Sequence, residues 1–355
     1  MPNRIAVISA AVGAALLALS GQAYAQATGI EVRLSGQVNR AIMHVDDGED
    51  SNQFFVDNIN SSTRFRLSAT APLTPGLRLG AIFEPEFPSN PSNAVSMATR
   101  DIAAEFNERH MDVFLEGSFG KVSLGQGDGA ANGATEVDLS GTAVANWAGA
   151  SLIGGGFGFR GDAGVFLGPT IGGSISNQDF ESRYDRVRYD TPKFGGFSLA
   201  GSLGSSGSQD VRELALWYTG DLGGLGRLAA ALGFSNQDAP VGGTEDEVVG
   251  GSVSWLHGSG LNLTLSHSQR EFGGRDRDFL YAKLGYKFGR HAISLDWGKG
   301  EDQAAAGVES DMIGLGYVWA PVAWADIYAA VKRHSLDVSG AEDISLFMVG
   351  TRVKF

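Results

Sequence analysis

The chain ends in the segment LFMVGTRVKF (346–355), whose residues alternate between two kinds of side chain. Four of its odd-numbered residues are phenylalanine or valine, whereas both of its charges, Arg352 and Lys354, are even-numbered. Side chains of a β-strand point alternately to opposite faces, so a period of two separates an apolar face from a polar one. The segment therefore predicts a strand that lies between an apolar medium and water.

The same period recurs along the chain, for example in STRFRLSATA (62–71) and FLYAKLGYKF (279–288). Glycine, a poor helix former, occurs 51 times among the 355 residues. We therefore expect an all-β protein, and the regular spacing predicts a transmembrane antiparallel up-and-down β-barrel of about 16 strands. The predicted strands cover residues 30–44, 59–71, 77–86, 104–117, 121–127, 183–192, 196–205, 211–220, 226–236, 246–256, 261–271, 279–287, 291–300, 310–320, 324–335 and 342–355.

The connections between these strands alternate in length. Short ones hold turn residues, such as Thr74-Pro75-Gly76, and the alternation predicts tight turns at one barrel end and loops at the other. One connection, residues 128–182, is 55 residues long and rich in small and apolar side chains. Connections of that length are usually functional or disordered. Because its small and apolar side chains would not be stable in solvent, we expect this one to fold into the barrel. The other predicted loops are residues 45–58, 87–103, 237–245 and 301–309.

Residues 1–25 have the features of a secretory signal peptide: Arg4, an apolar run over 5–19, and the small-residue site Ala23-Tyr24-Ala25. The apolar run is shorter than the roughly 20 residues that a membrane-spanning helix needs. Residues 26–355 then form a single β-barrel domain. Export combined with a barrel pattern predicts that the protein lies in the cell outer membrane, in contact with the lipid bilayer.

The formal net charge of −13 makes nucleic acid an improbable partner. The acids gather in the predicted loops, where they could hold divalent cations at a lipopolysaccharide surface or simply be solvated. No other cofactor is expected, and no histidine lies at a spacing typical of a metal site. The acidic clusters are Asp46, Asp47, Glu49 and Asp50; Glu245, Asp246 and Glu247; and Glu301 and Asp302.

Basic side chains recur on the predicted polar faces. Arg64 and Arg66 lie two residues apart on one strand, as do Arg186 and Arg188, while Arg33 and Arg78 lie on neighbouring polar faces. Barrel closure would point these six arginines inward. The long connection carries the acids Glu136 and Asp138, which could lie opposite. Opposed charges across a narrow channel would produce a strong transverse field, and we expect a constriction there.

Several stretches resemble the Gram-negative general porins, especially the trimeric 16-stranded kind. They are SGQVNRAIM (35–43), SSTRFRLSA (61–69), FGKVSLGQGDGA (119–130), SRYDRVRYDTPKFGGFSLAGS (182–202) and VGTRVKF (349–355), which includes the terminal phenylalanine. The resemblance implies a homotrimer with its third loop inside the barrel. By position, Glu136 and Asp138 match the family's loop acids, and Arg33, Arg64 and Arg66 match its basic wall. The Pro-Glu-Phe-Gly-Gly type of loop motif is absent from this chain.

These observations favour a water-filled channel for passive diffusion of ions and small hydrophilic solutes, constricted by residues 128–182. A substrate-selective channel for anions or sugars is the alternative. An outer-membrane enzyme would need a nucleophile and a base that converge, and no such pair is evident, so we expect no enzyme. A soluble secreted β protein would not need an apolar face on nearly every strand. The arginines favour anions, and the net charge favours cations, so we expect mild ion selectivity of undetermined sign.

Overall fold

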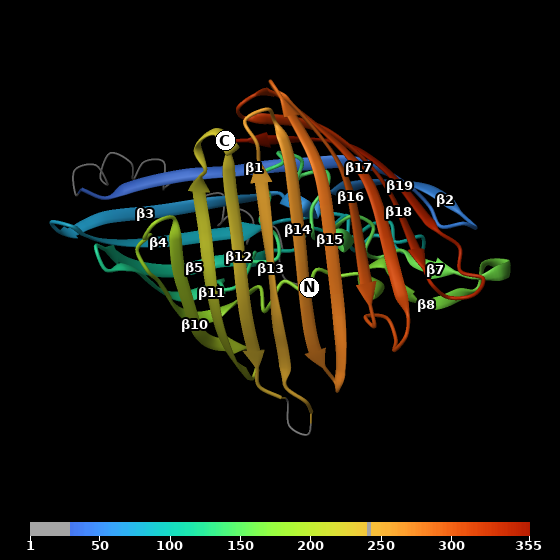
Figure 1. Cartoon of the computed structure of the whole chain (residues 1–355), viewed down its shortest axis with the longest axis horizontal. Helices are drawn as coiled ribbons and strands as arrows, with labels where there is room; N and C mark the ends of the chain where they lie inside the picture. The colour runs from blue at the N-terminus through green and yellow to red at the C-terminus, as the bar shows by residue number, and fades with distance from the viewer. Residues whose placement is uncertain (1–28, 240–242) are drawn as a thin grey trace, which may run out of the picture.

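The computed structural model describes residues 29–239 and 243–355, and the predicted signal peptide (1–25) lies outside them. The described chain folds into one closed antiparallel sheet whose last strand pairs with its first (Figure 1). Every strand pair of this sheet is antiparallel, and nearly all strands that follow one another along the chain are neighbours. This confirms the predicted up-and-down barrel. None of the described helical segments has the length and apolar character that a membrane crossing requires.

The strands of the barrel extend over most of the described residues. They are β1 (Glu31–Asp46), β2 (Ser51–Asp57), β3 (Arg64–Thr74), β4 (Leu77–Glu86), β5 (Asn107–Gly117), β6 (Gly120–Asp128), β9 (Arg183–Asp190), β10 (Phe197–Ser206), β11 (Gln209–Asp221), β12 (Arg227–Gln237), β13 (Asp246–Leu256), β14 (Leu261–Phe272), β15 (Arg275–Phe288), β16 (His291–Glu301), β17 (Glu309–Val322), β18 (Ala325–Leu336) and β19 (Ile344–Lys354). The remaining elements are β7 (Gly158–Arg160), β8 (Phe166–Thr170), α2 (Ile171–Ser174) and the 3₁₀ turns η1 (Ile59–Ser61), η2 (Ala150–Leu152), η3 (Asp162–Gly164) and η4 (Gly223–Leu225).

Strands β2 and β3 together occupy one position of the barrel, because both pair with β1. Counted in this way, the 17-stranded sheet is a 16-stranded barrel, as predicted. Between them the chain leaves the sheet at Asn58, whose side chain accepts a hydrogen bond from the Asn60 amide and caps η1. The residues predicted as loop 45–58 are therefore mostly strand. That prediction was wrong because Phe54 and Val56 are apolar on the inner face as well, which removes the two-residue alternation.

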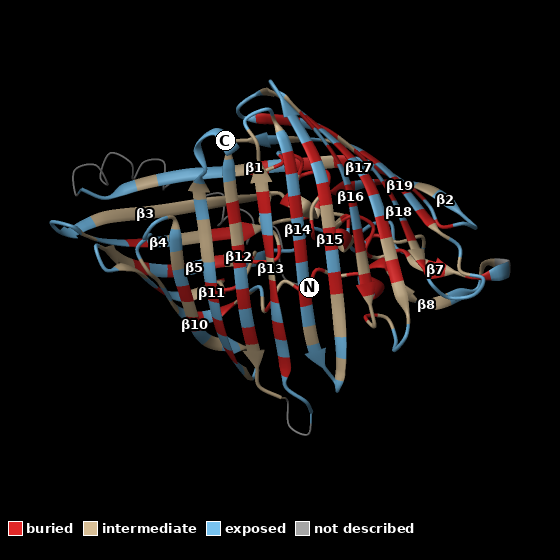
Figure 2. Cartoon of the chain, viewed as in Figure 1, coloured by how far each residue is buried: buried red, intermediate tan, exposed pale blue. Residues whose placement is uncertain are grey.

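The two faces of the sheet differ as the sequence predicts. Along β15, Leu280 and Leu284 are exposed on the outside, while Tyr281 and Lys283 are buried on the inside. Figure 2 shows the same alternation of buried and exposed residues along the strands at the front of the barrel. An exposed apolar outer surface matches a lipid environment, and a polar inner face matches an aqueous lumen.

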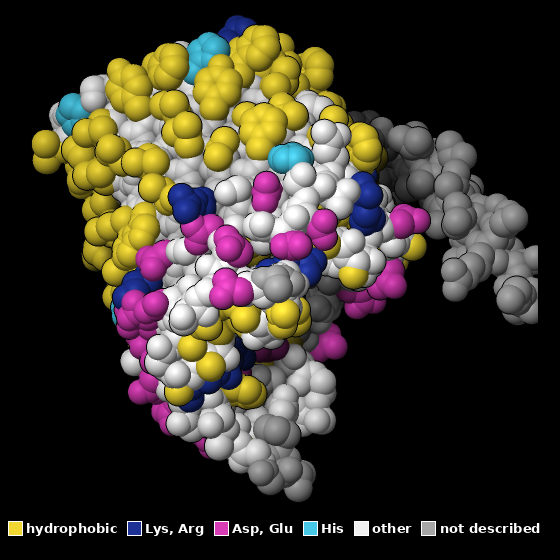
Figure 3. Space-filling model, turned by 90° about the vertical axis from the view of Figure 1, so that its right-hand side faces the viewer, with side chains coloured by type: hydrophobic (Ala, Val, Ile, Leu, Met, Phe, Trp, Pro, Cys, Tyr) yellow, Lys and Arg dark blue, Asp and Glu magenta, His cyan; other side chains and the backbone are white. Residues whose placement is uncertain are grey.

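Seen from its right-hand side, the molecule carries a continuous apolar surface above and charged side chains below (Figure 3). The charged part surrounds the barrel end with the loops. At the opposite end, exposed aromatic rings gather beside the short turns, including Phe194, Phe288, Trp319, Trp324 and Phe355. Membrane-spanning β-barrels carry aromatic residues in a girdle at each membrane–water interface, and the position of these residues at the turn end matches one such girdle.

The turns follow simple backbone chemistry. Between β3 and β4, Pro75 supplies the fixed φ of a tight turn and Gly76 adopts a φ of 80°, which L side chains rarely tolerate. At the other end, only two connections are long: residues 87–106 and residues 129–182, here called the second and third loops. The third loop contains the β7–β8 hairpin, η2, η3 and α2.

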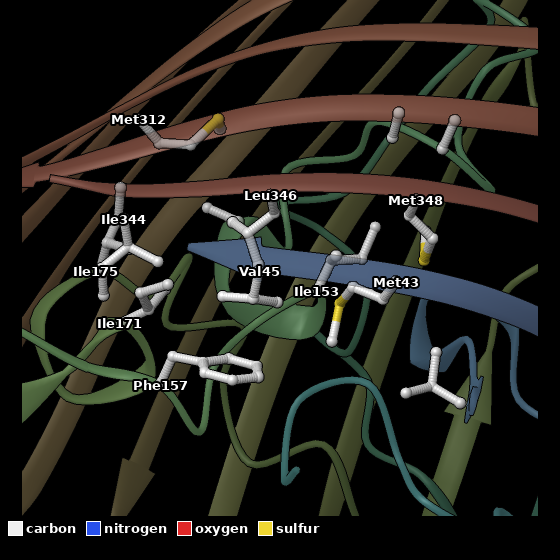
Figure 4. Close-up of a cluster of buried hydrophobic side chains, with 14 of the residues drawn as sticks. Met43, Val45, Ile153, Phe157, Ile171, Ile175, Met312, Ile344, Leu346 and Met348 are labelled. Carbon is white, nitrogen blue, oxygen red and sulfur yellow. The ribbon is translucent and has the colours of Figure 1, made fainter. Parts of the chain in front are cut away.

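The third loop lies inside the barrel, as expected. Its apolar side chains, such as Ile153 and Phe157, pack against Met43 and Val45 of β1 and Met348 of β19 (Figure 4). Val95 of the second loop joins the same cluster. Near the loop end, the part of the barrel interior next to β1, β2 and β15–β19 is therefore filled by a packed apolar core. A water-filled passage through the barrel must lie next to other strands.

Candidate functional site

The third loop is fastened to the inner wall of β13 to β16 by hydroxyl groups. The Ser252 hydroxyl donates to the Ala134 carbonyl and the Ser266 hydroxyl to the Thr135 carbonyl, each at 2.7 Å. The Thr142 hydroxyl donates to Ser294 at 2.8 Å. Because the wall offers small hydroxyl side chains here, the loop backbone can approach closely with its polar groups satisfied. The loop therefore lines one side of the barrel.

A buried ion pair strengthens this attachment. The Lys283 ammonium of β15 contacts the Asp138 carboxylate and donates to the Asn146 carbonyl at 2.8 Å. The Asn146 amide donates to Asp296 at 2.8 Å, which also accepts from the Tyr281 hydroxyl at 3.0 Å. The structure thus places Asp138 against Lys283 as an anchor of the loop.

Glu136 is held by the loop itself. The Asn177 side-chain amide donates to its carboxylate at 2.7 Å, and Asp179 nearby accepts from the Gly133 and Thr135 amides at 2.6 and 3.2 Å. Burial and the charge of Asp179 raise the pKa of Glu136 well above its usual value, although Asn177 and the Arg183 guanidinium oppose this. Burial likewise raises the pKa of Asp179. Glu136 is therefore an acid that gains its proton at unusually high pH.

Opposite the fastened loop, β3, β4 and β5 form a charged wall. The buried Glu84 accepts from Arg66 Nε at 2.5 Å and from Arg109 Nε at 2.7 Å, and Arg64 Nε lies 3.7 Å away. Glu86 pairs with Arg109 at 3.1 Å. The predicted pair Arg64 and Arg66 is thus part of a cluster in which three guanidinium groups share one carboxylate.

Arg183, at the start of β9, connects this wall to the loop. Its Nε lies 2.7 Å from Asp128, whose carboxylate is also 3.5 Å from His110 Nε2. Arg183 is near enough to Arg64 for their charges to interact, and it is the cation that acts on Glu136. The structure therefore brings Glu136, Arg64 and Arg66 into one charged zone through Arg183.

Arg186 and Arg188 also contact Asp128, but through its backbone carbonyl rather than its carboxylate. Arg186 is buried, pairs with Asp112 at 2.7 Å and donates to the carbonyls of Gly125 and Asp128. Arg188 donates to the Gly129 carbonyl at 2.7 Å, so both arginines hold the backbone where the third loop begins.

Arg33 and Arg78 lie near the turn end of the barrel. The Arg33 side chain is 75% exposed and pairs only with Glu31 among its acidic neighbours, at 2.5 Å. Arg78 is exposed close to the β3–β4 turn. Neither residue is joined to the cluster around Glu84 by an ion pair in the described structure.

The sequence interpretation missed Glu84, Glu86, Arg109 and Arg183. A signal for the first two was available, because the short turn after β3 aligns β4 with it and places Glu86 opposite Arg64. Arg109 lies at a break in the register between β4 and β5, which periodicity does not reveal. Lys283 lies on the predicted polar face of its strand, yet nothing local links it to Asp138.

One carboxylate of each acidic cluster forms an ion pair with a neighbouring cation. Asp47 accepts from Arg160 at 2.7 Å, Asp246 pairs with Arg270, and Glu301 lies 2.6 Å from Lys299. Within residues 29–239 and 243–355, no group of three or more acidic or histidine side chains is arranged to hold a metal ion.

Comparisons with known proteins agree with this architecture. A family model described as Gram-negative porin matches residues 10–339. The fold is similar to an anion-selective porin from Comamonas acidovorans, with a TM-score of 0.64 and 22% identity over 92% of this chain and 100% of that one. It is also similar to OmpF of Salmonella typhi, solved with daunomycin (TM-score 0.63, 13% identity, 92% and 98% covered).

A third similar structure is a trimer form of OmpT of Vibrio cholerae, with a TM-score of 0.59 and 17% identity over 92% of this chain and 100% of that one. No match was found among curated proteins. At these identities the likeness to solved structures establishes the fold.

Proposed function

The chain belongs to the Gram-negative porin family, and from this premise we propose where its channel narrows, which ions it prefers and how it assembles. The protein is an outer-membrane porin, a channel for passive diffusion of ions and small hydrophilic solutes. The observation that carries this conclusion is a closed barrel with a lipid-compatible outer surface and a charged passage beside an inward loop. We propose no catalytic role for it.

The constriction lies between Glu136 of the third loop and the arginines of β3, with Arg183 between them. Three features support this proposal: the loop is fixed to the far wall, the arginines keep part of their side chains exposed, and opposite charges face one another. Within low-dielectric walls such an arrangement orders water and favours small polar solutes. Exchange of Arg64 or Arg66 for alanine should widen the passage and raise its conductance.

We further propose that the passage prefers anions. Six cationic side chains on the inner wall each keep between 17% and 38% of their surface exposed, whereas two of the four carboxylates that pair with them are only 6% exposed. The cations therefore face the lumen in excess. They are Arg64, Arg66, Arg109, Arg183, Arg352 and Lys354, and the carboxylates are Glu84, Glu86, Asp128 and Asp326.

The acidic loops should oppose this preference only weakly, because exposed charges are screened beyond about 8–10 Å at physiological salt. Anion preference in the similar Comamonas porin is compatible with the proposal. The test is the reversal potential of the reconstituted channel under a KCl gradient. A reversal potential with the same sign as the chloride equilibrium potential supports the proposal, and one with the same sign as the potassium equilibrium potential contradicts it.

Finally, we propose that the protein is a homotrimer, as the trimer form of the similar Vibrio porin suggests. Light scattering of the detergent-solubilised protein, corrected for bound detergent, measures this directly. A mass of three chains supports the proposal, whereas a mass of one chain refutes it without affecting the channel. Lipopolysaccharide contact through cations on the acidic loops stays a prediction.

A further inference from the structure

The hairpin of β14 and β15 sorts its charges by sign at the loop end of the barrel. Its tip begins at Arg270 and reads REFGGRDRD, so basic and acidic residues alternate along β15. On β14, Arg270 lies two positions beyond the buried Ser268, and on β15, Arg275 and Arg277 precede the buried Phe279 at the same spacing. Residues two apart on a strand share a face. The three arginines therefore point into the barrel, and the acids between them point outward.

Strand pairing places like charges directly opposite each other. Arg270 is the cross-strand partner of Arg277 on the inner face, and Glu271 is the partner of Asp276 on the outer face. Like charges in directly opposite positions destabilise a sheet. Strand stability therefore does not account for the arrangement, which points to a use of the positive charge on the inner face.

The inward guanidinium groups are short of acceptors. Arg270 pairs with the buried Asp246, and Arg275 donates to the Gln303 carbonyl at 3.3 Å. In the described parts of the chain, the Arg277 guanidinium forms no hydrogen bond or ion pair, and the buried Nε atoms of Arg275 and Arg277 have no acceptor. Arg270 and Arg275 are near enough to act on the charge of Arg277, and Asp246 opposes them. Positive charge is thus in excess on this part of the inner wall.

The ring of Phe272 supports two of the arginines without neutralising them. Its centroid lies 5.5 Å from Cζ of Arg270 and 5.1 Å from Cζ of Arg277. A cation is attracted to the face of an aromatic ring, so these contacts offset part of the repulsion between the two guanidinium groups. The N–H donors of Arg277 stay available for an anion.

The arginines lie next to the proposed constriction. Near the end of the third loop, the Gln178 side chain donates to the Arg277 carbonyl at 2.8 Å. The preceding residue, Asn177, donates to the Glu136 carboxylate at 2.7 Å. Because the hairpin tip belongs to the loop end of the barrel, a solute that enters from that end passes the arginines before it reaches Glu136.

We propose that Arg270, Arg275 and Arg277, here called the mouth arginines, form a binding site for phosphate-type dianions and hold phosphorylated solutes before they enter the constriction. A guanidinium offers two parallel N–H donors that match two oxygens of a phosphate group. Several such groups around one site therefore favour a phosphate over chloride. Since the mouth arginines face the lumen, the phosphate belongs to a dissolved solute rather than to a lipid headgroup. This inference rests on the channel described under the proposed function and adds a substrate class to it.

Block of the chloride current by inorganic phosphate tests the site. The purified protein is inserted into a planar phosphatidylcholine bilayer without lipopolysaccharide, and phosphate at about pH 8, where it is mainly a dianion, is added to each side in turn. We expect a saturable block that needs less phosphate from the loop side, and no block by the same concentration of acetate. In protein with Arg275→Gln and Arg277→Gln, the half-blocking phosphate concentration should rise at least tenfold.

Two further variants separate a shaped site from general positive charge. Arg212→Gln removes an exposed cation at the same end, on the outward row of β11 and paired with Asp238, and should leave the half-blocking concentration unchanged. Arg275→Lys with Arg277→Lys keeps both charges but loses the paired donors, so that concentration should rise severalfold. The chloride current that remains shows that each variant is folded. An unchanged block in the glutamine or the lysine variant would overturn the proposal, as would conducting unmodified protein that phosphate does not block.

The outcomes also separate this site from the proposed anion preference of the passage. If the reversal potential in KCl has the sign of the chloride equilibrium potential but the block does not depend on Arg275 and Arg277, the site is refuted and the anion preference stands. If the potential has the sign of the potassium equilibrium potential yet the block depends on both arginines, the preference is refuted and the site stands. Folded protein that conducts no current would refute the channel and the site together.

Discussion

Replacing Glu84 by glutamine should make the channel more selective for anions. Glu84 is the carboxylate shared by Arg64, Arg66 and Arg109, and it is buried beneath them. Glutamine has nearly the same shape and still accepts a hydrogen bond. The exchange therefore removes one negative charge from the wall of the passage while leaving the three arginines in place.

The size of the effect follows from Coulomb's law. A unit charge about 8 Å from an ion in water changes its energy by about 0.5 kcal/mol, which alters its concentration roughly twofold. Since anions gain what cations lose, the ratio of anion to cation permeability should rise roughly fivefold at low salt. Screening over about 10 Å reduces the change to roughly twofold at 0.1 M salt.

The assay is the reversal potential of Glu84→Gln protein in a planar bilayer at two salt concentrations. The control is Glu31→Gln, which removes an equal charge from the exposed Arg33 pair at the turn end. The control should change the reversal potential less than Glu84→Gln does. A shift of Glu84→Gln toward cations, or equal shifts for both variants, would refute the assignment of the Glu84 cluster to the constriction.

Three further predictions concern the loop and the membrane. Burial and the charge of Asp179 raise the pKa of Glu136, so anion preference should increase as pH falls through that raised pKa. Glu136→Gln should show the acid value at every pH without such a step, and a retained step would contradict the assignment. A pKa that is higher in the folded chain also means that loop docking is most stable at low pH and weakens as pH rises through that pKa. Asp138→Asn leaves Lys283 buried without its carboxylate and should lower the stability of the protein by about 3–5 kcal/mol. The loss should appear as a lower temperature at which the folded band disappears on gels and as a noisier channel current. Asp138→Leu combined with Lys283→Met should recover most of the stability, and an Asp138→Asn variant without any effect would refute the role of this ion pair as an anchor. Leu284→Lys places a charge on the lipid face and should cost about 2–4 kcal/mol in urea-dependent folding into vesicles, whereas a cost below about 1 kcal/mol would place Leu284 outside the membrane.

The barrel could be predicted because the side-chain pattern of each strand depends on the surroundings of that strand alone. Alternation in residues 279–288 correctly assigns Leu284 to the outside and Lys283 to the inside, since each strand separates lipid from water. The same reasoning fails for β2, where Phe54 and Val56 point inward into an apolar core formed by the third loop. The alternation of apolar and polar residues depends on whether each face of a strand meets lipid, water or protein. A loop packed inside the barrel replaces water on the inner face, so the alternation is lost there.

The candidate site was only partly predictable. The inward orientation of Arg64 and Arg66 follows from their strand, and the sharing of Glu84 follows from the register of a hairpin. In contrast, the contact of Asp138 with Lys283 joins residues 145 positions apart, and no short-range pattern specifies it. The local pattern likewise does not distinguish Arg186, which holds the loop backbone, from arginines that face the lumen.

The most direct test of the account is the single-channel conductance of the purified protein in a planar lipid bilayer under a salt gradient. We expect the conductance to rise in large steps as molecules insert, and each step to close in three equal parts at high voltage. The reversal potential should have the same sign as the equilibrium potential of the anion. Correctly folded protein that migrates faster on gels before heating yet conducts no current would contradict the open channel.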